Sequence, residues 1–157
     1  FVGMTINQDT FTGEYSYSID AKSRVNIPAK FRQSLAPEND QTFVITRGID
    51  LCIWVYPLTA WQIIEDDLKD LSAISGINRS FIRNTVRYAS SVAFDKQGRI
   101  MLSTNLLDYA QLKKDALIIG MVNKIEIWDP NVLAKVDKQN LEMDSSEYDE
   151  LADKIIL

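Results

Sequence analysis

The amino-acid sequence predicts an α+β protein made of two related, interlocked halves with flanking helices. The order of expected elements is the first reason: a strand, a turn, an Asp-x-x-x-Arg motif, a short strand, a helix and a strand pair occur twice, which indicates an internal duplication. The motif spans Asp20 to Arg24 in the first half and Asp95 to Arg99 in the second. Length is the second reason, because 157 residues with 46% hydrophobic content suffice for one well-packed domain and are too few for two independent ones.

The first half begins with an expected strand over residues 11–19, in which apolar and polar side chains alternate. Asp20 then starts a turn, since its carboxylate can accept hydrogen bonds from backbone amides a few residues later. In the short strand after it, Arg24 lies on one face and Val25 and Ile27 lie on the other. The face with Val25 and Ile27 can therefore pack in the core, while the face with Arg24 can bind an anion.

The remainder of the first half alternates between turns, strands and helices. Pro28 ends the short strand because it lacks the N–H that a ladder needs, and it suits the start of a helix over residues 29–35. The polar residues 37–40 predict a turn. Apolar strands on either side of Gly48 predict a hairpin in which glycine permits a positive-φ reversal. A helix over residues 57–71 follows, with an apolar stripe at helical spacing: Trp61, Ile64, Leu68 and Leu71.

A second helix, over residues 77–89, carries Arg79, Arg83 and Arg87 at i, i+4 and i+8. This spacing places the three guanidinium groups along one slowly drifting helix face. Two interpretations are open. The basic stripe contacts DNA phosphate, or it pairs with acidic residues such as those of the preceding helix, within the chain or across a subunit boundary. The second interpretation is favoured, because an acidic helix comes directly before this one.

Matched hairpin strands and a helix started by Pro130 complete the second half, and the residues after Gln139 become acidic and irregular. We therefore expect a first repeat with its helix over residues 11–71. A second repeat over residues 76–138 packs with the first as one body. Residues 139–157 form an acidic C-terminal tail that either stays mobile or packs on a neighbouring subunit.

The net charge alone argues against nucleic-acid binding, but the distribution of the charged residues does not. The net charge is −5 and the pI is about 4.7, whereas nucleic-acid binders usually carry an excess of Lys and Arg. Six of the 22 acidic residues but one of the 17 basic residues lie in the last 16 positions. The remainder carries 16 residues of each sign, so its positive charge can still concentrate on one face.

The rare residue types exclude most enzyme classes. No histidine is present, which removes Ser-His-Asp triads, Cys-His pairs and histidine metal sites; we expect neither an enzyme nor a metal or other cofactor. Cys52 is the single cysteine, and its apolar neighbours predict a buried strand thiol in a reducing compartment. No apolar run approaches the ~20 residues that span a bilayer, and no secretion signal is recognisable. We therefore expect a cytoplasmic protein without a membrane partner.

Several motifs are distributed over residues 11–135: Phe11-x-Gly13-Glu14-Tyr15, Asp20-x-Lys22-x-Arg24-x-x-x-Pro28-x-x-x-Arg32, Thr46-Arg47-Gly48, Trp54-x-Tyr56-Pro57, Asp95-x-x-Gly98-Arg99 and Trp128. In this combination the chain resembles the MraZ family of bacterial transcriptional regulators, encoded at the head of the cell-division and cell-wall gene cluster. The resemblance implies two intertwined swapped-hairpin β-barrel units of the AbrB/SpoVT-like kind. It also implies a sequence-specific DNA-binding regulator, expected to be a repressor, that acts on tandem repeats in the promoter of its own gene cluster.

The Asp-x-x-x-Arg loops are the expected contacts to double-stranded DNA. An arginine on a rigid turn can neutralise phosphate and can bond guanine O6 and N7 with its planar fork. This assigns base or phosphate contact to Arg24 and the equivalent place to Arg99. The other expected DNA-binding residues are Lys22, Lys96, Gln97 and Arg32. Asp20 and Asp95 organise the loops or orient the arginines; the alternative is that each Asp and Arg forms only an exposed ion pair worth about 0.2 to 1 kcal/mol.

Departures from the family pattern favour a weaker second repeat. Family members usually carry glycine where this chain has Ser23, proline where it has Ser103, and a basic residue where it has Thr12 or Leu107. Affinity then requires several subunits on repeated sites, which can raise avidity about 100-fold or more. The resemblance implies a homo-oligomeric ring in the nucleoid, with no small-molecule substrate. The alternative function is a ring-forming assembly or interaction module with weak or no DNA affinity.

Overall fold

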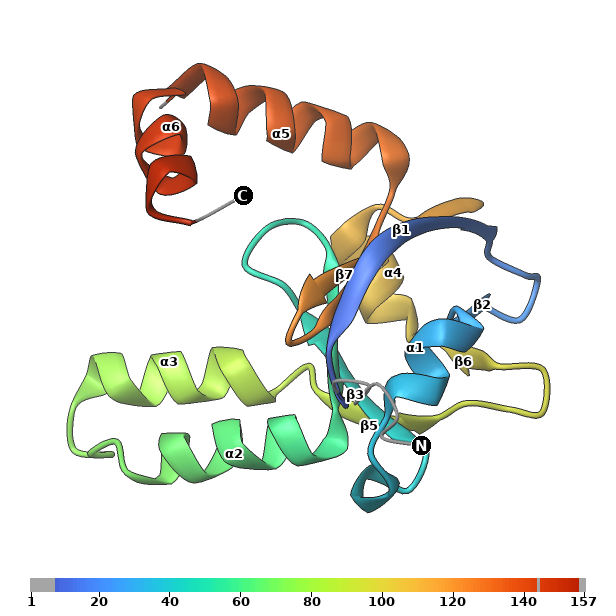
Figure 1. Cartoon of the computed structure of the whole chain (residues 1–157). Coiled ribbons are helices and arrows are strands. Elements are labelled where there is room, and N and C mark those ends of the chain that lie inside the picture. Colours follow the sequence, from blue (N-terminus) through green and yellow to red (C-terminus); the bar gives the residue numbers. More distant parts are fainter. Residues whose placement is uncertain (1–7, 144, 156–157) are drawn as a thin grey trace, which may run out of the picture.

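Strands from both halves of the chain lie side by side in one antiparallel sheet. The computed structural model describes residues 8–143 and 145–155. The strands are β1 Phe11–Ser18, β2 Arg24–Asn26, β3 Thr42–Arg47, β4 Ile53–Pro57, β5 Ser90–Ala93, β6 Arg99–Met101, β7 Asp115–Val122 and β8 Ile125–Trp128. In the described residues they form a six-stranded sheet of order β1-β7-β8-β4-β3-β5 and a two-stranded ribbon of β2 and β6 (Figure 1).

Strand pairing is exchanged between the two halves. β1 pairs with β7 and β5 pairs with β3, so each half contributes its first strand to the hairpin of the other half. The short strands are also exchanged, with Val25 opposite Ile100. The two hairpins meet at β4 and β8, where Ile53 lies opposite Ile127. Neither half therefore completes its sheet without the other.

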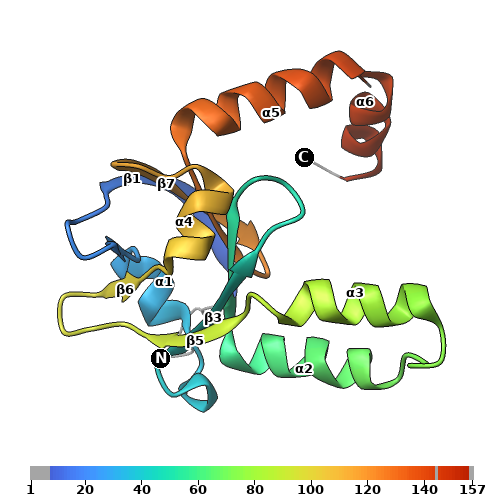
Figure 2. The same ribbon diagram turned by 180° about the vertical axis from the view of Figure 1, so that it is seen from behind.

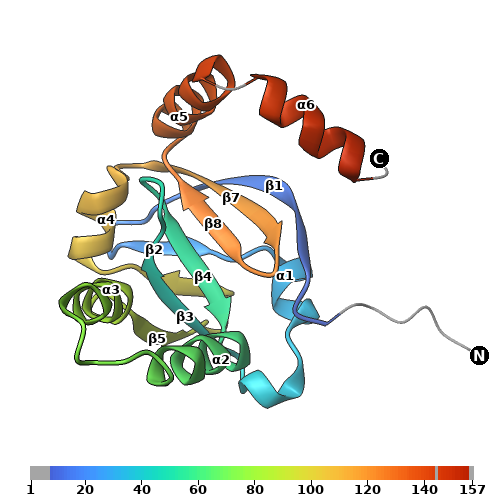
Figure 3. The same cartoon turned by 90° about the vertical axis from the view of Figure 1, so that its left-hand side faces the viewer.

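Helices connect the strands and project from the sheet. α1 (Ala29–Ser34) and α4 (Thr104–Ala110) follow β2 and β6, and a 3₁₀ turn (Pro37–Asn39) follows α1. α2 (Leu58–Lys69) and α3 (Gly76–Val86) form a helical hairpin that extends away from the sheet, as Figures 1 and 2 show. α5 (Pro130–Met143) and α6 (Ser145–Lys154) lie on another side of the molecule (Figure 3). None of the helices in the described residues has the length and apolar character needed to cross a membrane.

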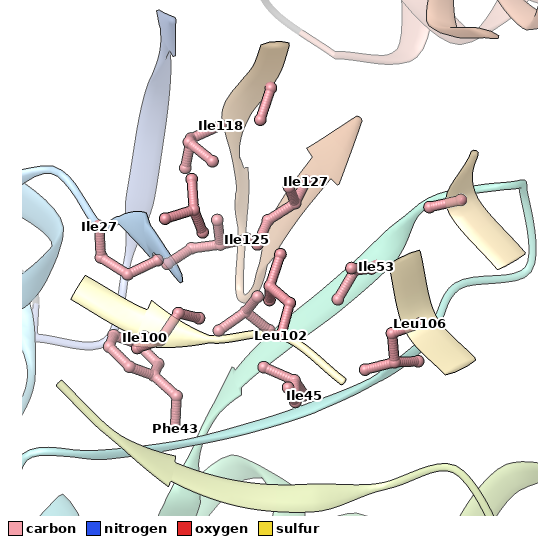
Figure 4. Packing of buried hydrophobic residues seen from close by; sticks show 14 of the residues in the cluster. Ile27, Phe43, Ile45, Ile53, Ile100, Leu102, Leu106, Ile118, Ile125 and Ile127 are labelled. Atoms are coloured by element: carbon pink, nitrogen blue, oxygen red, sulfur yellow. The ribbon is translucent and has the colours of Figure 1, made fainter. Parts of the chain in front are cut away.

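The core joins the ribbon to the central strands (Figure 4). Its fully buried side chains come from both halves and include Ile27, Phe43, Ile45, Ile53, Ile100, Leu102, Leu106, Ile118, Ile125 and Ile127. Burial of each large apolar side chain contributes about 1.5 to 3 kcal/mol. Because protein cores are close-packed, this shared core holds the two Asp-x-x-x-Arg loops in a fixed relation to each other.

A smaller apolar cluster attaches α2 to the sheet. Its buried residues are Val44, Tyr56 and Trp61. Trp61 comes from the apolar stripe predicted for this helix, whereas Leu71, beyond the other end of α2, is 38% exposed. The helical hairpin is therefore anchored at the end nearest the sheet.

Most elements lie where the sequence predicts them, with two corrections. Gly48 does not adopt positive φ; a Cβ there would lie 2.7 Å from Cys52 Sγ, so glycine is required for space rather than for a reversed backbone. The expectation that residues after Gln139 are irregular is also wrong, because α5 continues to Met143 and α6 follows it. The amphipathic character of this segment is enough to support helix. Residues 144 and 156–157 of the expected tail lie outside the described residues.

Candidate nucleic-acid interface

The two Asp-x-x-x-Arg loops share one hydrogen-bond pattern. Asp20 Oδ1 accepts hydrogen bonds from the backbone amides of Lys22 at 3.0 Å and Arg24 at 2.9 Å. Asp95 Oδ1 accepts the two equivalent bonds in the second loop at 2.9 and 3.0 Å. A short carboxylate that bonds the amides of its own turn restricts the loop to one conformation. Each aspartate therefore bonds two backbone amides of its own loop.

Each aspartate also holds the arginine of its loop. Arg24 Nε donates to Asp20 Oδ2 at 2.8 Å, and Arg99 Nε donates to Asp95 Oδ2 at 3.0 Å. Arg99 Nη1 lies 3.5 Å from Asp20 Oδ2, so Asp20 connects the two loops. Both arginine side chains remain 25% exposed. The intraloop ion pairs are therefore present, and the guanidinium groups are still reachable from solvent.

Hydrogen bonding lowers the pKa of both carboxyl groups. The main cause is the bond from the backbone amide of Arg24 to Asp20 and of Arg99 to Asp95; partial desolvation opposes it, and the arginine side chains add to it. Both groups are consequently ionised at neutral pH. A fixed negative charge shared by two guanidinium groups reduces the repulsion between them and sets their orientation.

The ribbon of β2 and β6 brings the loops together. The two strands run antiparallel, and two further backbone bonds extend their pairing into the loops. Ile27 N donates to Gly98 O at 2.9 Å, and Leu102 N donates to Ser23 O at 2.8 Å. These bonds occupy equivalent positions in the two halves, so each loop is fastened to the strand that follows the other loop.

The loops also carry exposed polar side chains. Lys22, Lys96 and Gln97 are exposed, and neither lysine makes an ion pair with the described residues. The structure therefore gathers five of the six residues predicted to bind DNA, including Arg24 and Arg99, on one double loop. We call this feature the Asp–Arg double loop; it consists of residues 20–24 and 95–99.

Arg32, the sixth predicted residue, packs against the second loop. Its Nε donates to Ile27 O at 3.0 Å, and its Cζ lies 5.8 Å from the ring centroid of Phe94. A Cβ added to Gly98 would come within 2.5 Å of Arg32 Cζ and Nε. Arg32 thus supports the loop of the other half while its own charge stays near the double loop.

A left-handed backbone occurs at the same position in both loops. Gly98 has φ of +78° and Ser23 has φ of +62°. This region is readily available to glycine but costs other residues about 1 to 2 kcal/mol. The glycine that the MraZ pattern carries where this chain has Ser23 therefore has a conformational reason.

Sequence analysis missed the environment of Arg47. Its Cζ lies 3.6 Å from the ring centroid of Tyr88 and 4.5 Å from that of Tyr109, and its Nη2 donates to Asn105 Oδ1 at 3.1 Å. Its Nε is buried without a hydrogen-bond partner among the described residues. The hairpin arginine is therefore held between two aromatic rings. No local signal predicts this, because the tyrosines are distant in the sequence.

Glu126 is a second residue that the sequence did not single out. Its carboxylate accepts hydrogen bonds from Trp54 Nε1 and Trp128 Nε1, both at 2.8 Å, and it lies 3.6 Å from Cys52 Sγ. Cys52 is fully buried, as predicted, although it lies one residue before β4. Burial and the charge of Glu126 raise the pKa of the thiol. This network joins the two central hairpins.

The basic stripe of α3 does not pair with α2. Among the described residues, Arg79, Arg83 and Arg87 form no ion pair with a carboxylate. Arg79 Nη1 donates instead to Ala73 O and Ile74 O at 2.9 and 2.7 Å. Pairing within the helical hairpin is thus excluded as an explanation of the stripe.

The repeated loops and exchanged strands define a class of duplicated α+β proteins in which the Asp-x-x-x-Arg loops of both repeats meet. Two matches to a family model described as "MraZ protein, putative antitoxin-like" cover residues 10–84 and 86–155. This chain belongs to the MraZ family. A protein of Natranaerobius thermophilus named "Transcriptional regulator MraZ" is 42% identical over 93% of this chain and 96% of its own length.

Relatives with the same name have similar coverage. The protein of Clostridium beijerinckii is 40% identical over 86% of this chain and 92% of its own length. The protein of Pediococcus pentosaceus is 38% identical over 93% of this chain and 96% of its own length. The likeness therefore extends over both repeats.

Proposed function

We propose that this protein is a sequence-specific DNA-binding regulator that represses its own cell-division and cell-wall gene cluster. It binds tandem repeats in the promoter as a homo-oligomeric ring in the nucleoid, without enzymatic activity. The Asp–Arg double loop carries the proposal, and the name of the relatives, "Transcriptional regulator MraZ", supports its regulatory class. The exchanged strand pairs support a swapped-hairpin β-barrel of the AbrB/SpoVT-like kind.

The geometry of the double loop suits recognition of DNA. Asp20 and Asp95 anchor the arginines through Nε, and Asp20 also holds Arg99 Nη1. Both terminal nitrogens of Arg24 and Nη2 of Arg99 are then the donors for the O6 and N7 atoms of guanine or for phosphate. Because anchored side chains lose less conformational entropy on binding, this arrangement favours affinity. Gln97 can bond a base or phosphate, and the loop lysines neutralise phosphate.

Self-assembly compensates for the small charge of each double loop. The two loops hold four cationic and two anionic side chains, so one subunit neutralises few phosphates. Several subunits on tandem repeats make the later contacts intramolecular, which raises avidity about 100-fold or more. Arg32 contributes by supporting the second loop and by its charge.

Binding of a fluorescent duplex from the upstream region of its own gene tests the proposal. Affinity should fall with salt, with a log–log slope of about −0.9 for each neutralised phosphate. Arg24→Ala should weaken specific binding by about 10- to 100-fold, since a bidentate contact to guanine discriminates by about 1 to 3 kcal/mol. Lys138→Ala, an exposed change on α5, is the matched control. Wild-type affinity of Arg24→Ala would contradict the site assignment.

The second candidate function is a ring-forming assembly module with weak or no DNA affinity. The pairing of both loop arginines with aspartate favours it, because this pairing reduces the charge offered to DNA. Titration with a scrambled duplex separates the candidates. Equal, weak binding of both duplexes by an intact oligomer would support the assembly module.

A further inference from the structure

A pocket of about 400 Å³ lies where the helical hairpin, the β3–β4 hairpin and α4 meet (Figure 3). Aromatic rings from several elements line it, among them Trp54, Tyr56, Trp61 and Tyr109. The rings of Trp54 and Tyr56 stand edge to face, with centroids 6.2 Å apart. Binding sites for small molecules usually have volumes of about 300 to 1,000 Å³, apolar and aromatic walls and few polar groups. The pocket has the size and the lining of such a site.

Two further apolar side chains of the lining are exposed to solvent. Phe81 of α3 is 57% exposed, and Ile49, in the loop between β3 and β4, is 86% exposed. A molecule bound in the pocket would remove apolar surface of both residues from water, which favours binding. The exposed side chains therefore add to the attraction for a ligand that has an apolar part.

Arg47 gives the pocket a positive charge. No other described residue of the lining is charged at neutral pH, because the two tyrosines keep their protons. Desolvation raises the pKa of Tyr56 to about 12 and also raises the pKa of Tyr109. With one guanidinium group and no carboxylate in its lining, the pocket favours a ligand that carries a negative charge.

The guanidinium group of Arg47 has few acceptors. It forms no ion pair with the described residues, and its one side-chain hydrogen bond to them runs from Nη2 to Asn105 Oδ1. Its Nε is buried without a partner among them. Buried donors of this kind call for an explanation, and an arginine fork is well suited to a carboxylate. Because Tyr88 and Tyr109 hold the group in place, an anion would meet a donor that is already ordered.

We propose that this pocket binds a small aromatic carboxylate, with its ring system against the aromatic lining and its carboxylate on Arg47. A single negative charge matches the single positive charge of the lining. No residue of the Asp–Arg double loop lines the pocket. The ligand site is therefore separate from the proposed DNA contacts, and the inference does not depend on them.

Calorimetric titration of the full chain with three probes tests the chemistry of the ligand. The first probe, 2-naphthoate, has both the ring system and the charge and should bind one molecule per chain. The second, 2-naphthamide, keeps the rings without the charge and should bind about 10-fold more weakly or worse, since charge-assisted hydrogen bonds are the stronger ones. The third, cyclohexanecarboxylate, keeps the charge without an aromatic ring and should bind roughly 2- to 10-fold more weakly.

Substitutions at two places test the position of the site. Arg47→Met should weaken binding of 2-naphthoate by about 10- to 100-fold, and Arg47→Lys should have a smaller effect because it keeps the charge without the fork. Asn84→Trp fills the pocket from the exposed side of α3 while Arg47 stays intact, and it should also abolish binding. Asn140→Trp makes the same change at an exposed position of α5 outside the pocket and should bind like the wild type.

Circular dichroism and urea unfolding of each variant separate loss of the site from loss of the fold. Asn84 is exposed, so Asn84→Trp should unfold like the wild type even if Arg47→Met is less stable. Arg24→Ala should bind 2-naphthoate normally, because Arg24 does not line the pocket. Failure of DNA recognition and failure of ligand binding are thus measured on different variants.

Several results would overturn the ligand proposal. These are a wild type that does not bind 2-naphthoate, equal binding of 2-naphthoate and 2-naphthamide, or wild-type affinity of a folded Arg47→Met or Asn84→Trp. A lower sedimenting mass of Asn84→Trp, but not of Asn140→Trp, would show that another subunit fills the pocket. That outcome would overturn the proposal as well.

Discussion

Replacement of Gly98 by alanine tests the close contact between the two halves. The new Cβ would lie 2.5 Å from Arg32 Cζ, so the guanidinium must move away from Ile27 O, to which its Nε donates at 3.0 Å. The backbone at this position also has φ of +78°. The substitution therefore strains the second loop and removes a contact made by the first half.

The expected destabilisation is about 1 to 3 kcal/mol. Left-handed backbone costs a residue with a Cβ about 1 to 2 kcal/mol, and loss of the Arg32 hydrogen bond costs about 0.5 to 1.5 kcal/mol. Reduced freedom of the unfolded chain offsets about 0.4 to 1 kcal/mol of this. For a domain of this size the melting temperature should fall by roughly 2 to 12 °C.

Urea unfolding of Gly98→Ala, Arg32→Ala and the double variant measures the contact. In the Arg32→Ala background, Gly98→Ala should cost only the backbone strain, so the two changes should be non-additive by about 0.5 kcal/mol or more. Additive effects would refute the steric contact. An unchanged free energy of unfolding for Gly98→Ala would refute both the steric contact with Arg32 and the backbone strain.

The remaining predictions concern stability, reactivity and pH. Ser23→Gly should stabilise the protein by about 0.5 to 1 kcal/mol in urea unfolding, because glycine relieves the left-handed strain at φ of +62°. Glu126→Ala should destabilise it by about 2 kcal/mol or more, since the indole N–H groups of buried Trp128 and half-buried Trp54 lose their acceptor. Cys52 should resist alkylation in the native protein and react on unfolding, as mass spectrometry would show, because burial raises its pKa. The lowered pKa values of Asp20 and Asp95 add stability that is present above their ordinary value of 3.8 and is lost as pH falls below it. The acid loss should be smaller when both are changed to asparagine.

Each of these predictions has an opposing result. A lower free energy of unfolding for Ser23→Gly would mean that contacts of the serine side chain stabilise the protein more than relief of the backbone strain does. If the stability of Glu126→Ala stayed within about 0.5 kcal/mol of the wild type, the substitution would behave like an ordinary surface change, and the predicted contribution of the Glu126 hydrogen bonds would be wrong. Rapid alkylation of native Cys52 would show that the thiol is accessible. Identical acid titrations of the wild type and the asparagine variant would dismiss the contribution of the loop carboxylates.

Local chemistry made much of the fold predictable. The alternation over residues 11–19 predicted β1, and Pro28 and Pro130 marked the starts of helices, because these signals depend on near neighbours alone. The turn bonding of Asp20 was predictable for the same reason. The family pattern also pointed to the position of Ser23, where the backbone is left-handed.

Contacts between distant residues were not predictable in this way. Asn39 was expected in a polar turn, yet it is fully buried and bonds Asp9 and Thr59. Arg47 belongs to the predicted hairpin, and nothing in that hairpin indicates that its guanidinium group lies between two tyrosine rings. Both cases require partners that only the folded chain supplies.

Residue types and their local spacing were enough to predict the α+β class, the duplication and the loop residues. Which strands pair, and that both loops meet at Asp20, became known from the folded chain alone. A strand offers the same backbone donors and acceptors to any neighbour, so its own residues do not select a partner. The choice of neighbour follows from packing of the shared core, which no single segment encodes.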